Sequence, residues 1–289
     1  MKIDTVQNIT NNRPFRHRYL NPFVLITLLG FIFLVLFIFA LKSTYSSKSD
    51  IVIRIAAAGI LNKEPNDLTD EDFRKITELT LDGKELSDIK LLGKFTNLKE
   101  LYLANIHPPK TRMPRWMSLL AKLRILDPSK KKLIDLSPLE KLSNLEIVTL
   151  IGSSVKDIKP LANLKNLKFL NLNETQVSDI KPVENLANLQ GLYLSKTSVS
   201  DIEPIKSLTE LKSLYLEDTG VSDLEPVRSL VGLMQLRLKD TKVTLLEPLS
   251  NLNNLQKLYL ENCRNVKRNE IEDLRKALPD LYIYQTPNF

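Results

Sequence analysis

The side chains most often used for catalysis or metal binding are scarce in this 289-residue chain. Cys263 is the only cysteine, which rules out a disulfide within the chain and a metal site built from several cysteines. The two histidines, His17 and His107, have no evident nucleophile, acid or second ligand beside them. An enzymatic interpretation would have to combine His107 with Asp127. We instead predict a protein with no enzymatic activity, no cofactor and no metal.

The formal net charge of +7 is concentrated at the N-terminus. Residues 1–42 contain five basic residues and one acidic residue, a net charge of +4, which leaves +3 for the other 247 residues. A nucleic-acid-binding domain would gather lysine and arginine on its folded part. We therefore predict no nucleic-acid partner.

Residues 23–41, FVLITLLGFIFLVLFIFAL, are apolar without interruption. A helix of these 19 residues is about 28 Å long, which matches the hydrocarbon core of a bilayer. The segment is longer than the apolar core of a cleaved signal peptide, and no clear cleavage site follows it. It is predicted to be a single transmembrane helix that acts as an uncleaved signal anchor.

Basic residues flank this apolar segment unequally. Three arginines stand close before it within residues 1–22, and the lysines behind it are more widely spread. The positive-inside rule therefore favours a cytoplasmic tail over 1–22 and a C-terminal domain on the outer side, in the periplasm or at a cell surface. The reverse orientation is the alternative. Residues 42–50, KSTYSSKSD, are predicted to be a polar tether.

From residue 76 onward the chain repeats the pattern L-x-x-L-x-L. The pattern recurs every 22 residues, except for one step of 25. Its nine first positions are Ile76, Leu98, Leu123, Leu145, Leu167, Leu189, Leu211, Leu233 and Leu255. This period and opening are typical of a leucine-rich-repeat solenoid. We predict an α/β fold in which nine stacked turns over 76–266 form a curved parallel sheet with short 3-10 or helical return legs.

Each core turn continues with a polar residue and a return leg of the form V-S-D-I-x-P-L. The L-x-L part alternates as a strand does, so both leucines point into the core. The threonine after the strand, Thr197 for example, is expected to hydrogen-bond the backbone. Asp201 and its equivalents are expected to be N-caps of the return legs, and Pro204 and its equivalents to stiffen them. Cys263 occupies the threonine position and is predicted to be a buried structural thiol.

These turns resemble those of bacterial leucine-rich-repeat proteins of the internalin type. The resemblance covers 76–266 and is most specific in the return legs Val177–Val183, Val199–Ile205 and Val221–Val227. This chain carries threonine where the family usually has asparagine. The resemblance implies a solenoid that binds partners with aromatic residues on its concave face. No immunoglobulin-like domain or wall-sorting motif is evident after the repeats, so a role in host invasion is not implied.

The residue between the last two leucines of each turn points out of the sheet and is free to vary. Down the turns it is Thr80, Tyr102, Asp127, Thr149, Asn171, Tyr193, Tyr215, Arg237 and Tyr259. Tyrosine and arginine are common anchors of protein interfaces, so we predict a partner-binding patch on this face. Its residues are Phe169, Tyr193, Tyr215, Arg237 and Tyr259, with Tyr102 further along the column. Alternatively, the tyrosines pack on one another and only stabilise the sheet.

Both ends of the solenoid need a cap, and the flanking sequences suit one. Residues 51–75 are predicted to form a helix to about residue 61, a turn, and a second short helix from Thr69, where T-D-E-D is a near capping box. Residues 267–289 are predicted to form an amphipathic helix from Asn269, which stops before Pro279, and a final strand.

One turn departs from the pattern. Between Leu103 and Leu123 the chain is three residues longer than the standard and contains three prolines, His107 and Trp116. A protruding contact loop and a turn of a different subtype, with Trp116 over the core, both fit this segment. In the next turn Pro128 replaces a strand leucine and is expected to disturb the sheet.

Two functions follow from these features. In the first, a membrane-anchored module binds a protein partner, or a glycan, through the concave face. In the second, the domain is a structural spacer or scaffold of the cell envelope without a ligand on that face.

Overall fold

The computed structural model describes residues 47–82, 86, 88–104 and 135–286. The tail at 1–22, the predicted transmembrane helix at 23–41 and the first part of the tether lie outside these residues. No helix within the described ranges is both long and apolar enough to cross a membrane. All described residues belong to one unit, Tyr45–Phe289.

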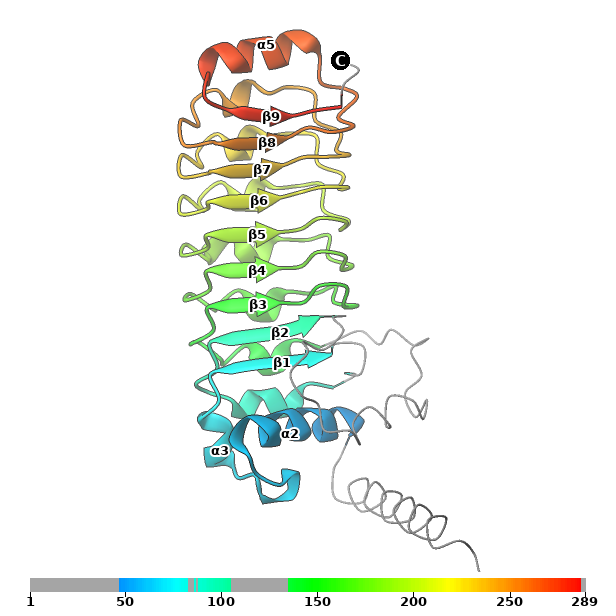
Figure 1. Cartoon of the computed structure of the whole chain (residues 1–289), viewed down its shortest axis with the longest axis vertical. Coiled ribbons are helices and arrows are strands. Elements are labelled where there is room, and N and C mark those ends of the chain that lie inside the picture. The colour runs from blue at the N-terminus through cyan, green and yellow to red at the C-terminus, as the bar shows by residue number, and fades with distance from the viewer. Residues whose placement is uncertain (1–46, 83–85, 87, 105–134, 287–289) are drawn as a thin grey trace, which may run out of the picture. The chain divides into compact units, whose positions relative to one another are not determined.

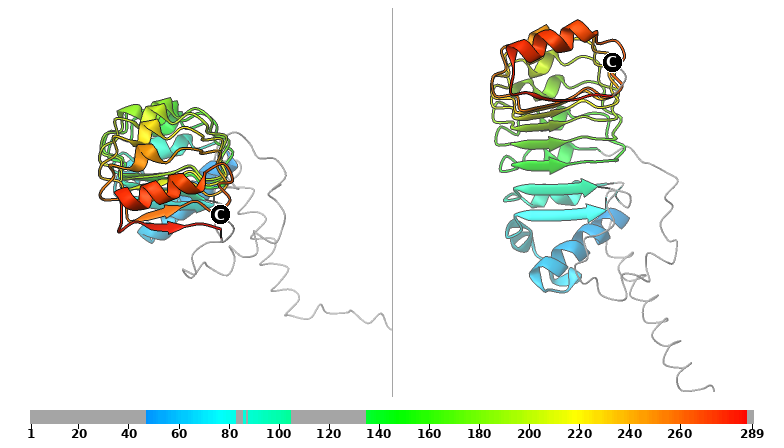
Figure 2. Two further views of the ribbon diagram at one scale, coloured as in Figure 1. Left: turned by 90° about the horizontal axis from the view of Figure 1, so that it is seen from above. Right: turned by 45° about the horizontal axis from the view of Figure 1, so that its top comes forward.

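In the described part of the chain, nine parallel strands form one sheet, and each strand pairs with its neighbour in the sequence. They are β1 (Glu78–Asp82), β2 (Glu100–Ala104), β3 (Ile147–Thr149), β4 (Phe169–Asn171), β5 (Gly191–Tyr193), β6 (Ser213–Tyr215), β7 (Gln235–Arg237), β8 (Lys257–Tyr259) and β9 (Tyr282–Tyr284). The strands lie side by side on one wall of the stack, and the return legs form the opposite wall (Figures 1 and 2). This arrangement confirms the predicted repeat solenoid.

The repeated leucines fill the space between these two walls. Leu192, Leu214 and Leu236 are register partners on β5, β6 and β7, and all three are fully buried. A single turn cannot bury such residues, whereas stacked turns share one continuous core.

One predicted strand is absent from the sheet. β2 pairs directly with β3, and the partners Tyr102 and Thr149 are 47 residues apart, whereas partners on β3 and β4 are 22 apart. The prediction that Asp127 lies between Tyr102 and Thr149 in the sheet is therefore wrong. In the sequence, Pro128 stands where the repeat has its second strand leucine, and proline has no N–H to donate to a strand ladder. Residues 105–134, which include His107, Trp116 and Asp127, lie outside the described residues.

The return legs contain short 3-10 helices. They are η3 (Lys90–Lys94), η4 (Ser137–Leu139), η5 (Lys159–Leu161), η6 (Lys181–Asn185), η7 (Glu203–Ile205), η8 (Glu225–Val227) and η9 (Glu247–Leu249). From η4 onward, proline is the second residue of each, as predicted. Its fixed φ suits the start of such a helix, and its missing N–H is not needed there.

The aspartates of the return legs were predicted to be N-caps, but each lies one residue before the N-cap. The N-cap of η7 is Ile202, which makes no side-chain capping bond. Asp201 instead accepts a hydrogen bond of 2.9 Å from the backbone N–H of Glu203, the first helical residue. The equivalent bonds of Asp157, Asp179 and Asp223 are 2.8–2.9 Å long. Each aspartate thus satisfies an orphan N–H of the helix through an Asx-turn.

Two further side-chain columns stabilise the turns, the threonines by bonds within a turn and the asparagines by bonds between successive turns. Thr175, Thr197, Thr219 and Thr241 each donate a hydrogen bond of 2.6–2.7 Å to the leucine carbonyl three residues earlier, as predicted. Cys263 continues this column as a buried thiol that donates to the Leu238 carbonyl at 2.9 Å, and burial raises its pKa. Asn144, Asn166, Asn188 and Asn254 donate to carbonyls of the preceding turn at 2.8–3.0 Å.

The turn after each of the strands β3 to β8 places one residue in the left-handed backbone region. Glu174, Lys196, Asp218, Asp240 and Asn262 have φ of 54–60°, and Gly152 has φ of 65°. This region disfavours most side chains, and asparagine and glycine tolerate it best. We expect Glu174→Asn to raise the free energy of unfolding by about 0.5–1 kcal/mol. Guanidinium denaturation of the full chain measures the change, and Glu184→Asn, an exposed replacement in η6, is the control that should not stabilise.

The N-terminal cap is formed by α2 (Lys48–Leu61), η1 (Pro65–Asp67) and α3 (Asp70–Arg74). α2 lies at the end of the stack beside β1 (Figure 1), and its Ile53 and Ala57 are fully buried. The helix, turn and second helix agree with the prediction. α2 begins earlier than expected, because Ser47 accepts a capping bond of 3.1 Å from the Asp50 N–H. Residues 48–50, which the sequence assigned to the tether, are therefore helical.

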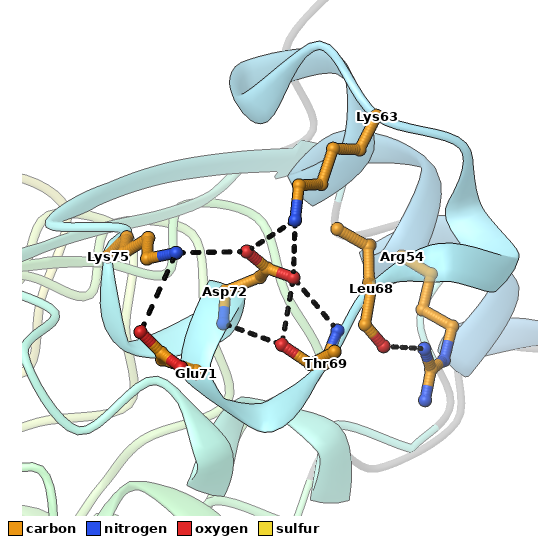
Figure 3. Close-up of polar contacts among 7 residues, drawn as sticks. All are labelled: Arg54, Lys63, Leu68, Thr69, Glu71, Asp72 and Lys75. Carbon is orange, nitrogen blue, oxygen red and sulfur yellow. Dashed lines mark hydrogen bonds and ion pairs between the residues drawn. The ribbon is translucent and has the colours of Figure 1, made fainter.

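The predicted capping box at Thr69 is present and is part of a larger polar network (Figure 3). The buried Asp72 carboxylate accepts hydrogen bonds from the Thr69 N–H at 3.0 Å and the Thr69 hydroxyl at 2.8 Å. Lys63 Nζ lies 2.8 Å and 2.9 Å from its two oxygens, and Lys75 Nζ lies 3.3 Å away. Lys63 and then Thr69 are the main causes that hold the pKa of Asp72 well below its usual range.

We expect Asp72→Asn to lower the unfolding midpoint of the full chain at neutral pH. Because the pKa of Asp72 is lower in the folded state, its stabilisation is present above the unfolded pKa of about 4 and is lost as the pH falls below it. The difference between wild type and Asp72→Asn should therefore shrink below about pH 4. Guanidinium titrations at several pH values test this. Glu71→Gln, which changes an exposed neighbour, should show no comparable change.

The C-terminal cap is α5 (Arg268–Ala277) followed by β9. α5 closes the end of the stack next to β9 (Figure 1), and its Ile271 and Leu274 are buried. Glu270 on this helix accepts a hydrogen bond of 2.9 Å from the Leu246 N–H, which ties the cap to the last return leg. The helix and final strand agree with the prediction, and the helix ends before Pro279.

Candidate functional site

The variable residues between the strand leucines form one column on the open face of the sheet. In strand register the column is Thr80, Tyr102, Thr149, Asn171, Tyr193, Tyr215, Arg237, Tyr259 and Tyr284. The members from Asn171 to Tyr284 are all half-buried. The prediction that Tyr193, Tyr215, Arg237 and Tyr259 share one face is confirmed by their register.

Four of the predicted residues are in direct contact. The rings of Tyr193 and Tyr215 meet edge to face, with centroids 4.7 Å apart and planes at 85°. The guanidinium carbon of Arg237 lies 4.4 Å from the centroid of Tyr215 and 4.5 Å from that of Tyr259. Arg237 is therefore sandwiched between two tyrosine rings, an arrangement stabilised by cation–π attraction.

The series of ring contacts continues onto β9 in the C-terminal cap. The tyrosines of this strand were not among the predicted binding residues. Tyr284 stacks on Tyr259 with centroids 4.2 Å apart and an interplanar angle of 1°. Tyr282, on the same strand, tilts against Tyr284 at 4.5 Å and is 62% exposed. The Y-I-Y alternation at 282–284 was a signal for these residues, but they lie outside the 22-residue period. We call Tyr193, Tyr215, Arg237, Tyr259 and Tyr284 the aromatic stack.

Phe169 lies beside the N-terminal end of the aromatic stack, above Gly191. A Cβ atom at Gly191 would lie 2.7 Å from the Phe169 ring and 2.9 Å from the Tyr193 hydroxyl. Both side chains thus occupy the space above Gly191, which only a residue without a side chain leaves open. Burial, followed by the neighbouring Tyr215, raises the pKa of Tyr193. Its phenol is therefore a neutral hydrogen-bond donor at physiological pH.

Tyr102 lies in the same column but is separated from Tyr193 by Thr149 and Asn171. Its hydroxyl donates a hydrogen bond of 2.7 Å to Glu100. Burial and that carboxylate raise the pKa of Tyr102 to about 12. The structure therefore places Tyr102 on the predicted face but not in the aromatic stack.

Charged residues flank the aromatic stack on both sides. Toward the C-terminal ends of the strands, Glu217 lies 3.4 Å from Arg237 and accepts a hydrogen bond of 3.2 Å from Ser195. Lys239 and Glu261 follow in the same flanking column. Toward the N-terminal ends, the first residue of each strand and the residue before it include two exposed lysines beside β5–β8, Lys212 and Lys257, and neither has an ion pair within the described ranges.

The proposed catalytic alternative is not located by the structure, because His107 and Asp127 lie outside the described residues. Cys263, the only cysteine, is buried in the threonine column and has a raised pKa, the opposite of an activated thiolate.

Comparisons with known proteins agree with the repeat architecture. A family model described as Leucine Rich repeats (2 copies) matches residues 187–229. An internalin C2 from Listeria monocytogenes has a similar structure, with a TM-score of 0.66, 24% identity, and coverage of 83% of this chain and 97% of that one. The repeat domain therefore has a leucine-rich-repeat fold similar to that of an internalin. A search of curated protein sequences gives no significant match.

A second solved structure supports the same assignment of this leucine-rich-repeat protein. An internalin F from Listeria monocytogenes has a TM-score of 0.58 and 26% identity, covering 84% of this chain and 78% of that one. The leucine-rich-repeat fold is that of an interaction or scaffold module, which offers an extended surface rather than an enclosed pocket. The open face of the sheet, with its aromatic stack, is the candidate site on this module.

Proposed function

We propose that this leucine-rich-repeat protein is an interaction module that binds a protein partner through the aromatic stack. The observation that carries the proposal is the unbroken series of ring and guanidinium contacts from Tyr193 to Tyr284. Over five adjacent strands this series extends about 19 Å, the length of a small interface core. Its residue types are those that contribute most of the binding energy at protein interfaces.

Preorganisation supports the same proposal. A long arginine or tyrosine side chain normally loses rotamer freedom when a partner immobilises it. Here the stacking contacts already fix Arg237 between Tyr215 and Tyr259. A partner therefore meets side chains that are already ordered, and less of the interaction energy is spent on ordering them.

Membrane anchoring by residues 23–41 is the second part of the proposal. Only six residues separate the predicted end of that apolar segment from Lys48, the first residue of α2. Such a linker spans at most about 22 Å, so the N-terminal cap would be held close to the membrane. Protease protection on intact cells tests the outer location. Digestion of the repeats in intact cells supports it, and protection until lysis contradicts it.

Site-specific photo-crosslinking tests the binding face. A benzoylphenylalanine at Gln235, beside Arg237, is expected to capture a defined partner band, and the same probe at Lys181 in η6 is not. Triple replacement of Tyr193, Tyr215 and Tyr259 by alanine should abolish the band. Triple replacement of Lys159, Lys181 and Lys242, exposed residues away from the strands, should leave it intact. Equal capture from both probe positions would contradict a site on the sheet.

A structural spacer or scaffold is the second candidate, and the internal stacking favours it. Tyr259 and Tyr284 pack face to face within the domain, which stabilises the last strand without any ligand. Deletion of residues 1–42 separates the two functions. The shortened chain should still bind its partner if the aromatic stack is the site, and should lose its role if anchoring in the envelope is the function.

A further inference from the structure

The covered ring faces of the aromatic stack restrict the chemistry of its ligand, and the inference drawn from them rests on the proposed function. Tyr259 has Arg237 over one face and Tyr284 over the other. Arg237 likewise has tyrosine rings on both faces of its guanidinium. Sugar rings bind tyrosine by lying flat on an open ring face. The centre of the stack offers no such face, so it is poorly suited to a glycan.

Because ring faces at the centre of the stack are covered, a ligand there meets ring edges rather than ring faces. Aromatic ring edges carry the positive part of the quadrupole, and a guanidinium edge carries hydrogen-bond donors. The phenol of Tyr193 is a further hydrogen-bond donor. These groups favour a ligand rich in acceptors, such as carboxylates and backbone carbonyls.

The charged residues beside the stack indicate on which side acidic groups of a ligand would lie. Lys212 directly precedes β6, and Lys257 is the first residue of β8, in register with Gln235 and Tyr282. The other residues at these two positions beside β5–β8 are Gln190, Gly191, Ser213, Met234, Gln235 and Gln256, and none of them is acidic. On the other flank the Glu217 carboxylate is already engaged by Arg237 and Ser195. That flank mixes Glu217 and Glu261 with Lys239, so the side of Lys212 and Lys257 is the more favourable one for acidic groups of a ligand.

We propose that the partner is a protein segment that places acidic side chains along Lys212 and Lys257 while its apolar part packs on the ring edges of the aromatic stack. We also assign Tyr282 to this site, as an exposed anchor at its C-terminal end. Tyr282 is 62% exposed and lies next to Lys257 in register.

Selection from a random peptide library displayed on phage, against the full chain in detergent micelles, tests this chemistry. The selected peptides are expected to be enriched in aspartate and glutamate next to an apolar residue. The double charge reversal Lys212→Glu and Lys257→Glu should weaken their binding at least about tenfold at low salt, and higher salt should reduce that difference. Lys181→Glu with Lys242→Glu is the matched control and should change binding less than twofold.

The outcomes separate this inference from the proposed function. Peptides that require Tyr259 but are neither acidic nor sensitive to the Lys212 and Lys257 reversal overturn the acidic ligand and leave the binding face in place. Peptides that ignore Tyr259, or a failure to select any, count against both. A glycan array probed with the same chain supplies the other arm. Glycan binding that is lost in Tyr259→Ala overturns the inference, and glycan binding lost only in Tyr282→Ala overturns the assignment of Tyr282 to a protein site.

Discussion

Replacement of Tyr259 by alanine is expected to weaken partner binding about a hundredfold. Tyr259 lies between Arg237 and Tyr284 and contacts both, so its removal breaks the aromatic stack between these two residues. Arg237 loses one of its two ring partners and regains rotamer freedom, and Tyr284 loses its stacking surface. The affinity loss thus combines the missing contact with the cost of reordering its neighbours when the partner binds.

Titration of the crosslinked partner against the full chain by surface plasmon resonance measures this effect. Tyr102→Ala is the matched control, because Tyr102 has the same residue type and column but lies apart from the stack. It should change affinity less than threefold. Equal losses in the two variants would place the binding centre outside the stack. Tyr259→Phe retains the stacking ring and should bind within about fivefold of wild type.

Replacement of Leu214 by alanine is expected to lower the free energy of unfolding by about 3–4 kcal/mol. Leu214 is fully buried in the middle of the stack, between Leu192 on β5 and Leu236 on β7. The substitution removes buried methyl groups and leaves a cavity that the neighbouring turns cannot easily fill, since a solenoid has fixed turn spacing. Because each turn is stabilised by its neighbours, the loss should reduce protection of β5 and β7 as well as β6.

Guanidinium denaturation gives the overall change, and hydrogen exchange locates it among the strands. Leu245→Ala is the control within the same repeat array. Its side chain is 60% exposed, so its replacement should change stability by less than about 0.5 kcal/mol. A Leu214→Ala variant as stable as Leu245→Ala would contradict a shared core, and exchange limited to β6 would contradict coupling between turns.

The repeat period carried most of the information about the fold. A fixed interval of 22 residues with leucines at matching positions requires each turn to stack on the next, so the parallel sheet follows from the sequence alone. The N-terminal cap was predictable for a different reason. Thr69 and Asp72 have the spacing of a capping box, and such local hydrogen bonds depend on only a few neighbouring residues.

The interruption of the array required the tertiary structure. The sequence at Leu123 continues the leucine pattern closely enough to suggest another strand, yet β2 pairs with β3. Strand pairing depends on which backbone groups meet in space. A pattern match in the sequence does not report which strands become neighbours, and the proline at position 128 lacks the N–H that a ladder needs.

The residues of the candidate site could also be predicted only in part from the sequence, and the tertiary structure supplied the rest. The column containing Tyr193, Tyr215, Arg237 and Tyr259 follows from strand alternation, because every second residue points to the same face. The presence of Tyr284 in this column could not be predicted in the same way. β9 belongs to the C-terminal cap, and Tyr284 does not follow Tyr259 at the 22-residue interval. The covered ring faces likewise depend on rotamers and strand spacing. The sequence by itself determined which residue types share the open face, and only the tertiary structure decided which of them touch, because contact depends on distance and ring orientation as well as on order along the chain.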